Sequence, residues 1–187
     1  GIHNSLNLNF YPDGSNLNSW TTGLFDVYLN DTDGTRIYHQ LGPNLNFNWN
    51  TTGVGFSYTD YTEILRPKDF PGIFTNTRYD YDNWQVNVFN NSLQTATFRA
   101  SYRQGKALNL VPQVGSLPYV ADTNRVDLTL LWRPIDRVSI NNTYFLTELK
   151  NSGGGAKILS NEIFRSNWNY QFTKELSLRF IAQYDKT

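Results

Sequence analysis

Two histidines, His3 and His39, are the residues of this sequence that could act as a general base. A serine hydrolase needs such a base beside a serine nucleophile and a carboxylate or amide that orients the ring. Ser57 could reach His39 only if the segments that carry them pair suitably, and the sequence contains no nucleophile elbow. The favoured interpretation is that both histidines are solvated, so the sequence predicts no catalytic residue and no enzyme.

The segment Asp31–Gly34 (DTDG) resembles the start of a calcium-binding loop. Such a loop needs a bidentate glutamate at its twelfth position, and Gly42 stands there instead. A plain Asp–Gly turn is the better interpretation. The chain also has no cysteine, which excludes a disulfide-stapled fold and a thiolate metal or redox site. We therefore expect neither a metal nor a cofactor.

A set of charged residues shares one face of the predicted strands and is the most informative chemistry in the chain. If that face lines a wet lumen, these charges would set the ion preference. If they pair across neighbouring strands, they form a structural ladder of ion pairs. Both interpretations stay open at the level of the sequence. The set consists of Asp26, Arg99, Asp127, Arg133, Arg165 and Arg179.

The elements that carry these residues are predicted to be strands, because the hydrophobic period is two almost everywhere. In Asn44–Trp49 (NLNFNW) asparagine alternates with Leu45, Phe47 and Trp49 without interruption. No segment shows the i, i+3, i+4 stripe of an amphipathic helix. The sequence predicts an all-β chain of about ten strands. No shift in composition marks a second domain, so residues 1–187 are expected to form a single β-barrel segment.

The connections between the strands alternate in length. Tight turns are predicted at Pro12–Asn16, Asn50–Gly53, Asn90–Ser92, Arg133–Arg137 and Thr173–Glu175. The other connections are predicted at Asn30–Thr35, Ile64–Phe74, Arg103–Thr123 and Lys150–Lys157, and three of these four are long. Short turns at one end and longer loops at the other are typical of outer-membrane barrels. The spacing leaves strands of about 9–12 residues, the length of a tilted membrane-spanning strand.

Strand length and the aromatic residues favour an antiparallel up-and-down transmembrane β-barrel with its apolar face toward lipid. Aromatic side chains lie beside the tight turns, as an interfacial girdle requires. The predicted girdle consists of Phe10, Trp20, Trp49, Trp132 and Phe172. The predicted lumen-facing polar residues are Asn44, Asn46, Asn48, Arg99, Asp127, Arg133, Arg165, Asn167, Asn169 and Arg179.

The alternative is a soluble extracytoplasmic barrel or sandwich that binds carbohydrate or an apolar ligand. In that case Trp20, Trp84 and Tyr119 would be candidate stacking platforms. An outer-membrane hydrolase ranks third. The balanced formal charge, with 16 basic and 16 acidic residues, gives no sign of a nucleic-acid partner.

Two C-terminal runs, "NRVDLTLLWRPIDRVSINNTYF" and "IFRSNWNYQFTKELSLRFIAQYDK", resemble an uncharacterised family of bacterial outer-membrane β-barrels. That family (domain of unknown function 5916) often follows a carbohydrate-binding-module-like domain. The most specific part is Asn169–Arg179, and "TGVGFSYTDY" matches another family segment more loosely. The resemblance implies a segment of a larger barrel and supplies no catalytic residue.

These observations predict a bacterial outer-membrane protein that acts as a passive channel, an anchor or a structural subunit of an envelope assembly. Its expected partners are the lipid bilayer of the outer membrane and, secondly, other envelope proteins.

Overall fold

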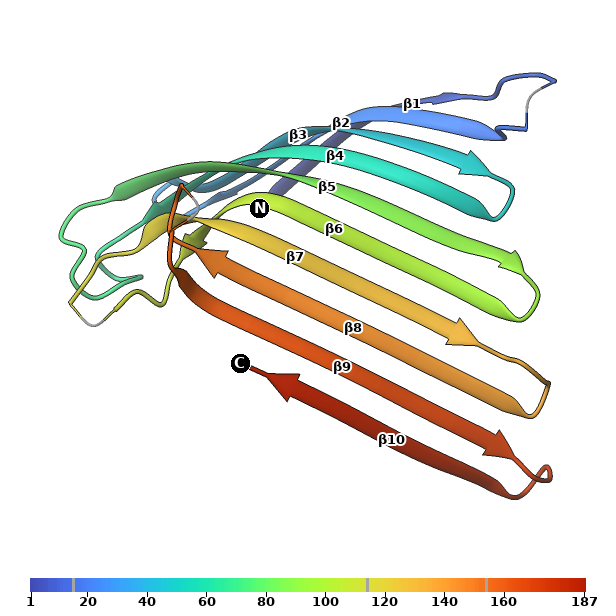
Figure 1. The fold of residues 1–187 in the computed structure, drawn as a ribbon. Coiled ribbons are helices and arrows are strands. Elements are labelled where there is room, and N and C mark those ends of the chain that lie inside the picture. Colours follow the sequence, from blue (N-terminus) through green and yellow to red (C-terminus); the bar gives the residue numbers. More distant parts are fainter. Residues whose placement is uncertain (15, 114, 154) are drawn as a thin grey trace.

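In the computed structural model the chain forms one antiparallel sheet of ten strands (Figure 1). The structure describes residues 1–14, 16–113, 115–153 and 155–187, and the side chain of Ser92 lies outside the description. Consecutive strands are neighbours throughout, so the predicted all-β, up-and-down fold is confirmed. The strands are β1 (Ile2–Phe10), β2 (Ser19–Asn30), β3 (Arg36–Trp49), β4 (Thr52–Leu65), β5 (Thr77–Leu93), β6 (Ala96–Asn109), β7 (Tyr119–Trp132), β8 (Val138–Lys150), β9 (Lys157–Gln171) and β10 (Ser177–Lys186).

The connections divide between the two ends of the sheet. At one end, called the turn end here, they cover residues 11–18, 50–51, 94–95, 133–137 and 172–176. At the other, the loop end, they cover residues 31–35, 66–76, 110–118 and 151–156. Ser15, within the turn predicted at Pro12–Asn16, is outside the described residues. The first pair departs from the expected alternation, because the connection 11–18 is longer than the connection 31–35.

Two predicted connections are wrong in their bounds. The segment Asn90–Ser92 belongs to β5, and a register shift between Asn90 and Leu93 absorbs it as a bulge before the chain turns at 94–95. The loop predicted at Arg103–Thr123 is confined to 110–118, because β6 and β7 stay paired as far as Asn109 and Tyr119. Backbone pairing does not depend on side-chain polarity, so the strands continue where the apolar alternation stops. Strand lengths therefore run from 9 residues in β1 to 17 in β5, beyond the predicted range.

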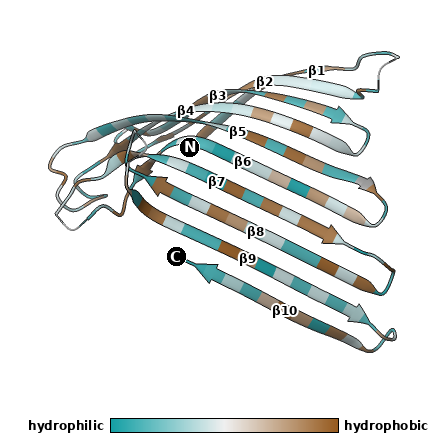
Figure 2. Ribbon diagram, viewed as in Figure 1, coloured by the Kyte–Doolittle hydropathy of each residue, from teal (hydrophilic) through white to brown (hydrophobic). Residues whose placement is uncertain are grey.

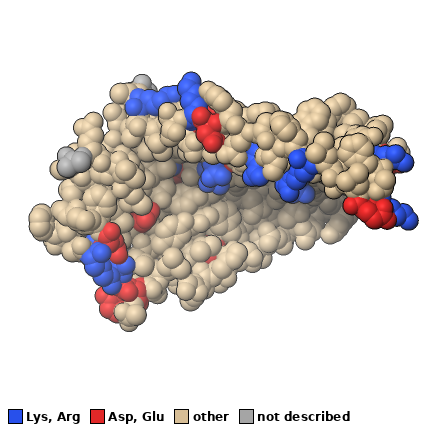
Figure 3. Space-filling model, turned by 90° about the horizontal axis from the view of Figure 1, so that it is seen from below, with Lys and Arg blue, Asp and Glu red and all other residues tan. Residues whose placement is uncertain are grey.

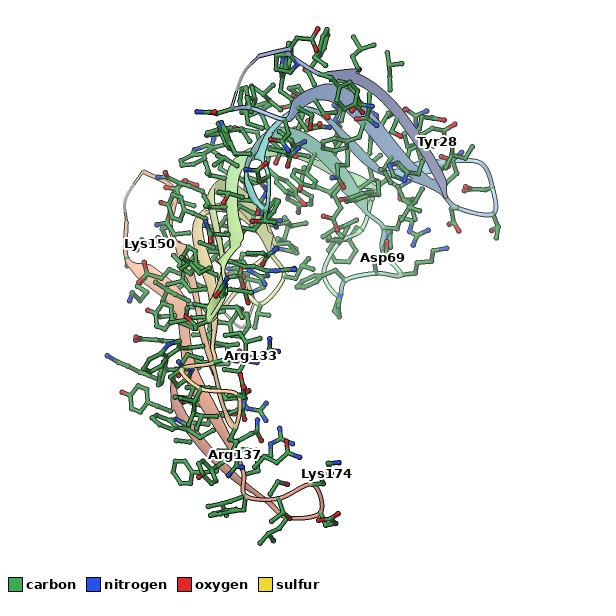
Figure 4. The ribbon with its side chains drawn as sticks, turned by 90° about the vertical axis from the view of Figure 1, so that its right-hand side faces the viewer. Tyr28, Asp69, Arg133, Arg137, Lys150 and Lys174 are labelled. Carbon is green, nitrogen blue, oxygen red and sulfur yellow. The ribbon has the colours of Figure 1, made fainter. Side chains whose placement is uncertain are left out.

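The sheet is strongly curved (Figure 1), and hydrophobic and hydrophilic residues alternate along many of its strands (Figure 2). The register keeps apolar residues together, since Trp20 pairs with Phe47 and Phe47 pairs with Val54. These residues lie on the convex face. Figure 4, seen along the strands from the turn end, shows Arg133 and Arg137 on the concave side. The middle of the convex face forms a largely apolar band, called the apolar belt here, whose polar members are Thr22, Asn142 and Ser166. It is made of alternate residues of 6–10, 20–24, 45–49, 54–58, 84–88, 98–102, 126–132, 138–146, 164–170 and 178–184.

The described residues contain almost no hydrophobic core. Their buried apolar residues are Leu65, Ile73, Ala121 and Ile140, whereas Phe180 of the apolar belt is 60% exposed. The accessible surface is 12317 Å², against about 9200 Å² expected for a water-soluble monomer of this mass. Much of the apolar surface of the described residues is therefore exposed. The same residues include no helix long and apolar enough to cross a membrane.

The sheet is not closed. β1 pairs only with β2 and β10 pairs only with β9, so each outer strand has one unpaired edge. Every residue of β1 and of β10 is exposed. The ten strands thus form a curved wall that surrounds a hollow on one side, as Figure 3 shows.

Glycines allow neighbouring strands to approach closely on the concave face, between β3 and β4 and between β5 and β6. A Cβ atom on Gly42 would lie 1.9 Å from the carbonyl oxygen of Tyr58, and one on Gly105 would lie 2.5 Å from Asn83 Cα. Gly105 also has a φ of 146°. The residues next to these glycines, Thr59 and Asn83, are buried. Close packing of backbone against backbone at this level leaves no room for a side chain.

Because of this contact, we expect Gly42→Ala to lower the free energy of unfolding of the full-length protein by about 2–4 kcal/mol. The change is measured by urea unfolding in detergent, with the folded fraction read from the migration of unheated samples in gels. Gly14→Ala is the matched control: it adds the same methyl group where no atom lies within 4 Å. Its positive φ should cost only about 1–2 kcal/mol. A Gly42→Ala protein as stable as the unsubstituted one would contradict this account of the bend.

Candidate functional site

The five aromatic residues predicted as a girdle all lie at the turn end, and their aromatic neighbours pack against them on the convex face. Phe10 and Trp20 stack with ring centroids 3.9 Å apart. The rings of Trp49 and Phe47 are 6.0 Å apart, and Phe172 meets Tyr170 edge-on at 4.5 Å. Trp132 ends β7 and is 45% exposed. This arrangement is what an interfacial girdle needs, although the contact with a membrane stays a prediction.

A second row of aromatic residues borders the apolar belt on its loop-end side, and sequence reasoning missed it. Trp84 meets Tyr102 edge-on at 5.3 Å. The Tyr58 hydroxyl donates a hydrogen bond to Asp60 over 3.1 Å, and the Tyr144 hydroxyl donates one to Glu162 over 3.2 Å. The hydroxyl groups of Tyr58 and Tyr144 thus reach carboxylates of the same face. In the sequence these residues could have been recognised as aromatic residues that have a charged or amide residue at an even spacing in the same strand. The row consists of Tyr58, Trp84, Tyr102, Tyr144 and Tyr184.

Beyond this second row the convex face becomes polar. His39 Nε2 lies 2.7 Å from Asp26 Oδ1, with both residues on the convex face. The prediction that Asp26 lies on the lumen side is therefore wrong. The cause is local: in β2 the alternating apolar residues Phe25, Val27 and Leu29 point to the concave face. They contribute there to an apolar and aromatic cluster near the loop end.

The register also separates the residues of the hydrolase hypothesis. Ser57 pairs with Asn44 and lies on the concave face, whereas His39 lies on the convex face. The sheet stands between them. No group of three or more histidine, aspartate or glutamate side chains within the described ranges could hold a metal ion. Asp31 and Asp33 instead bond the backbone N–H groups of Thr32 and Thr35, each at 2.8 Å, as in a turn.

The stacking platforms of the soluble alternative do not converge on one site. Trp20 is covered on one side by Phe10, and Trp84 packs edge-on against Tyr102. Tyr119 lies at the loop end, where its hydroxyl donates to Asn151 over 2.9 Å. All five tryptophans of the chain lie on the convex face, within the apolar belt.

The concave face carries amide and hydroxyl side chains on β1–β5. Asn44, Asn46 and Asn48 lie there, next to Ser57 and small residues of β4. Asn46 donates a side-chain hydrogen bond to Asn44 over 3.4 Å. Toward the other edge of the sheet, Asn167 and Asn169 of β9 also lie on the concave face. The face is not purely polar, because Phe89, Phe145 and Ile181 also project from it.

The predicted charged residues on this face divide into paired and unpaired groups. Asp127 accepts a hydrogen bond from Arg125 Nε over 2.9 Å, so this carboxylate already has a cation. Arg99, Arg165 and Arg179 have no ion pair or side-chain hydrogen bond within the described ranges and are exposed. Arg133 lies in the connection after β7, toward the concave side (Figure 4). A continuous ladder of ion pairs, one of the two open interpretations, is therefore absent from the described residues.

Two connections are tied together at the loop end of the hollow. Arg66 bonds both Asp31 and Asp69, the latter at 2.6 Å, and Lys68 Nζ lies 2.7 Å from Asp31. The cations hold both carboxylates in their charged form: the Lys68 ammonium lowers the pKa of Asp31, and the Arg66 guanidinium lowers the pKa of Asp69 to about 2. Arg66 and Asp69 also line a cavity of about 550 Å³, together with Leu29, Tyr38 and Phe70.

Comparison with known proteins supports the fold. No family model matches the chain, and no curated protein matches it. Among solved structures the chain is similar to OmpF of Salmonella typhi, in a complex with daunomycin, with a TM-score of 0.58 and 12% sequence identity. The similarity covers 96% of this chain and 53% of that chain, so this chain spans about half the length of that structure. The likeness establishes a porin-like β-barrel architecture for the sheet.

The ion pairs at Asp31 predict how the connection 66–76 responds to substitution and pH. We expect pepsin to cut Asp31→Asn within 66–76 about tenfold faster than the unsubstituted protein at pH 4, because the cations lose their shared carboxylate. Asp33→Asn is the control, since Asp33 bonds only within its own turn.

The same ion pairs predict a dependence on pH. A carboxylate whose pKa is lowered by folding stabilises the fold above the unfolded value of about 3.9, and this stabilisation is lost as pH falls through the folded value. In the unsubstituted protein the Arg66–Asp69 pair should therefore weaken near pH 2, and the connection should open only below that pH, where Asp31 also takes up a proton. Equal cutting of Asp31→Asn and Asp33→Asn at pH 4 would contradict the role given to the Asp31 carboxylate.

Proposed function

We propose that this chain forms part of the wall of a bacterial outer-membrane β-barrel and acts as a passive channel. The apolar belt carries the proposal. It runs from Leu178 to Tyr184 on β10 and from Val138 to Leu146 on β8, roughly 20–30 Å along each strand. Aromatic rows border it on both sides, which is how strand proteins meet the two surfaces of a bilayer.

The orientation of the belt supports a tilted barrel wall. The cross-strand row that contains Trp20 near the turn end of β2 continues through Leu128 and reaches Tyr184 near the loop end of β10. From β2 to β10, a row of paired residues therefore shifts toward the loop end. The apolar belt, in contrast, stays at a similar distance from the turns. Strands that tilt against the axis of a closed barrel produce this offset.

The open edges bear on the size of the barrel. Unpaired backbone groups of β1 and β10 would each cost several kcal/mol in lipid, so further strands must pair with both edges in a membrane. A barrel of more than ten strands is wider than its side chains can fill, whereas one of about eight strands is packed. Size and the polar concave face together favour a water-filled lumen over a solid anchor.

In this proposal each group of side chains has a physical task. The apolar belt makes the contacts with lipid that a polar surface could not make, and the aromatic rows hold the wall at a fixed depth in the bilayer. Amides such as Asn46 exchange hydrogen bonds with water and with passing solutes. The ion pairs at Arg66 hold the connection 66–76 at the outer mouth of the hollow. Membership of the family with domain of unknown function 5916, and contacts with other envelope proteins, remain predictions.

Extraction and conductance test the proposal on the full-length protein. We expect it to stay with membranes in plain buffer, to become monodisperse only in detergent, and to give discrete conductance steps after reconstitution into a planar bilayer. A heat-unfolded sample is the control and should give no steps. Monodisperse protein in plain buffer would refute the membrane wall and favour the soluble ligand-binding alternative. A correctly inserted protein that leaves the bilayer sealed would refute the channel and leave an anchor.

A further inference from the structure

Charged residues are distributed unequally over the concave face. On its strands the basic residues are Arg99, Arg103, Arg125, Arg165 and Arg179, and all five lie on β6–β10. The acidic ones in the described strands are Glu63, Asp127 and Asp185. Lysines of the same strands, such as Lys106 and Lys150, lie on the convex face among carboxylates. The concave wall therefore uses guanidinium groups only.

Each of the three concave carboxylates has a hydrogen-bond partner, and for Asp127 that partner is a cation. Asp127 accepts from Arg125 at 2.9 Å, and Asp185 accepts from the amide of Gln183 at 3.0 Å. Glu63 accepts from the hydroxyl of Tyr81 at 3.1 Å, near the loop end. Arg103 is also engaged, since its Nε donates to Gln85 over 2.9 Å. These contacts leave Arg99, Arg165 and Arg179 without an anionic partner among the described residues.

The three unpaired arginines lie along one wall of the hollow. Arg99 and Arg165 share a cross-strand row through Thr129 and Thr143, three strand spacings apart, or about 14 Å. Arg179 lies on the neighbouring β10, nearer the turn end, opposite Asn169. Figure 3 shows lysine and arginine atoms along this wall of the hollow. This spacing exceeds the Debye length of about 8–10 Å, so at physiological salt each guanidinium group acts as a separate positive site on the wall.

The opposite wall does not neutralise this charge. On β1–β5 the concave face presents neutral amides such as Asn46 and Asn87, and its strand carboxylate is Glu63. At the turn end Arg133 and Arg137 extend the basic wall, as Figure 4 shows, beside Asp136 in the same connection. The connection after β9 adds Lys174 and Glu175, which offset each other.

We infer that the unpaired arginines of β6, β9 and β10 form an anion-recognition wall, so that solutes bearing carboxylate, phosphate or sulfonate groups pass in preference to cations. The inference rests on the proposed channel. A guanidinium offers a planar fork of N–H donors that matches two oxygens of such a group. An anion can step from Arg179 to Arg165 and then to Arg99, and several separate sites let it enter the wall and leave it again.

Reversal potentials of the full-length protein in a potassium chloride gradient test the selectivity. We expect chloride to permeate at least about threefold better than potassium. The triple variant Arg99→Gln, Arg165→Gln, Arg179→Gln should lower that ratio by about threefold or more. Arg78→Gln is the matched control, because Arg78 lies on the convex face and pairs with Asp80. Its ratio should equal that of the unsubstituted protein. Potassium preference, or a triple variant with an unchanged ratio, would overturn the inference.

Binding of an anionic dye separates failure of the channel from failure of the arginine wall. Pyranine, a trisulfonate, is titrated against the full-length protein in nonionic detergent at low salt, with fluorescence anisotropy as the readout. We expect the triple variant to bind at least about tenfold more weakly, and Arg78→Gln to bind within about twofold. A protein that is silent in bilayers but shows this pattern would refute only the channel. A protein that conducts but shows no difference between the variants would refute only the arginine wall.

Discussion

Every strand of this protein must find backbone partners on both sides, and the structure is organised around that requirement. β2 to β9 are each paired along two edges by neighbours in sequence, and the antiparallel ladder continues past the apolar segments into the polar loop end. Because the backbone groups of β2 to β9 are satisfied by this ladder, their side chains can differ between the two faces. One face can then be apolar without a second layer to cover it.

Because the paired backbone does not need a second layer, the chain of 187 residues has few buried apolar residues among those described. A soluble sheet would cover Phe47, Trp132 and Phe180 with another layer. Here they stay exposed in a belt between two aromatic rows. The concave face in turn needs no core, apart from the close contact at Gly42 and the tyrosine cluster near the loop end. There Tyr61 and Tyr81 stack 5.0 Å apart.

The sequence sufficed for the strand order, for the faces of most strands and for the position of the five aromatic residues at the turn end, because all three depend on local alternation. It failed where alternation was ambiguous. β2 alternates Phe25, Asp26, Val27 and Tyr28, and both faces are half apolar, so only pairing with β3 decides that Asp26 points outward. It also failed at Asn90, where a bulge shifts the turn. Whether Arg99 has a partner could not be predicted, since pairing across strands depends on registers that a single sequence does not specify.

The central claim is that the convex face meets lipid and the concave face meets water, and two adjacent residues of β3 test it most directly. Asn46 and Phe47 point to opposite faces, and the chain has no cysteine of its own. Asn46→Cys and Phe47→Cys are made separately in the full-length protein, reconstituted into vesicles and treated with a charged, water-soluble methanethiosulfonate reagent. The account predicts that Asn46→Cys reacts about a hundredfold faster than Phe47→Cys, since ionic reagents are excluded from the hydrocarbon region. Equal rates, or faster reaction of Phe47→Cys, would contradict it.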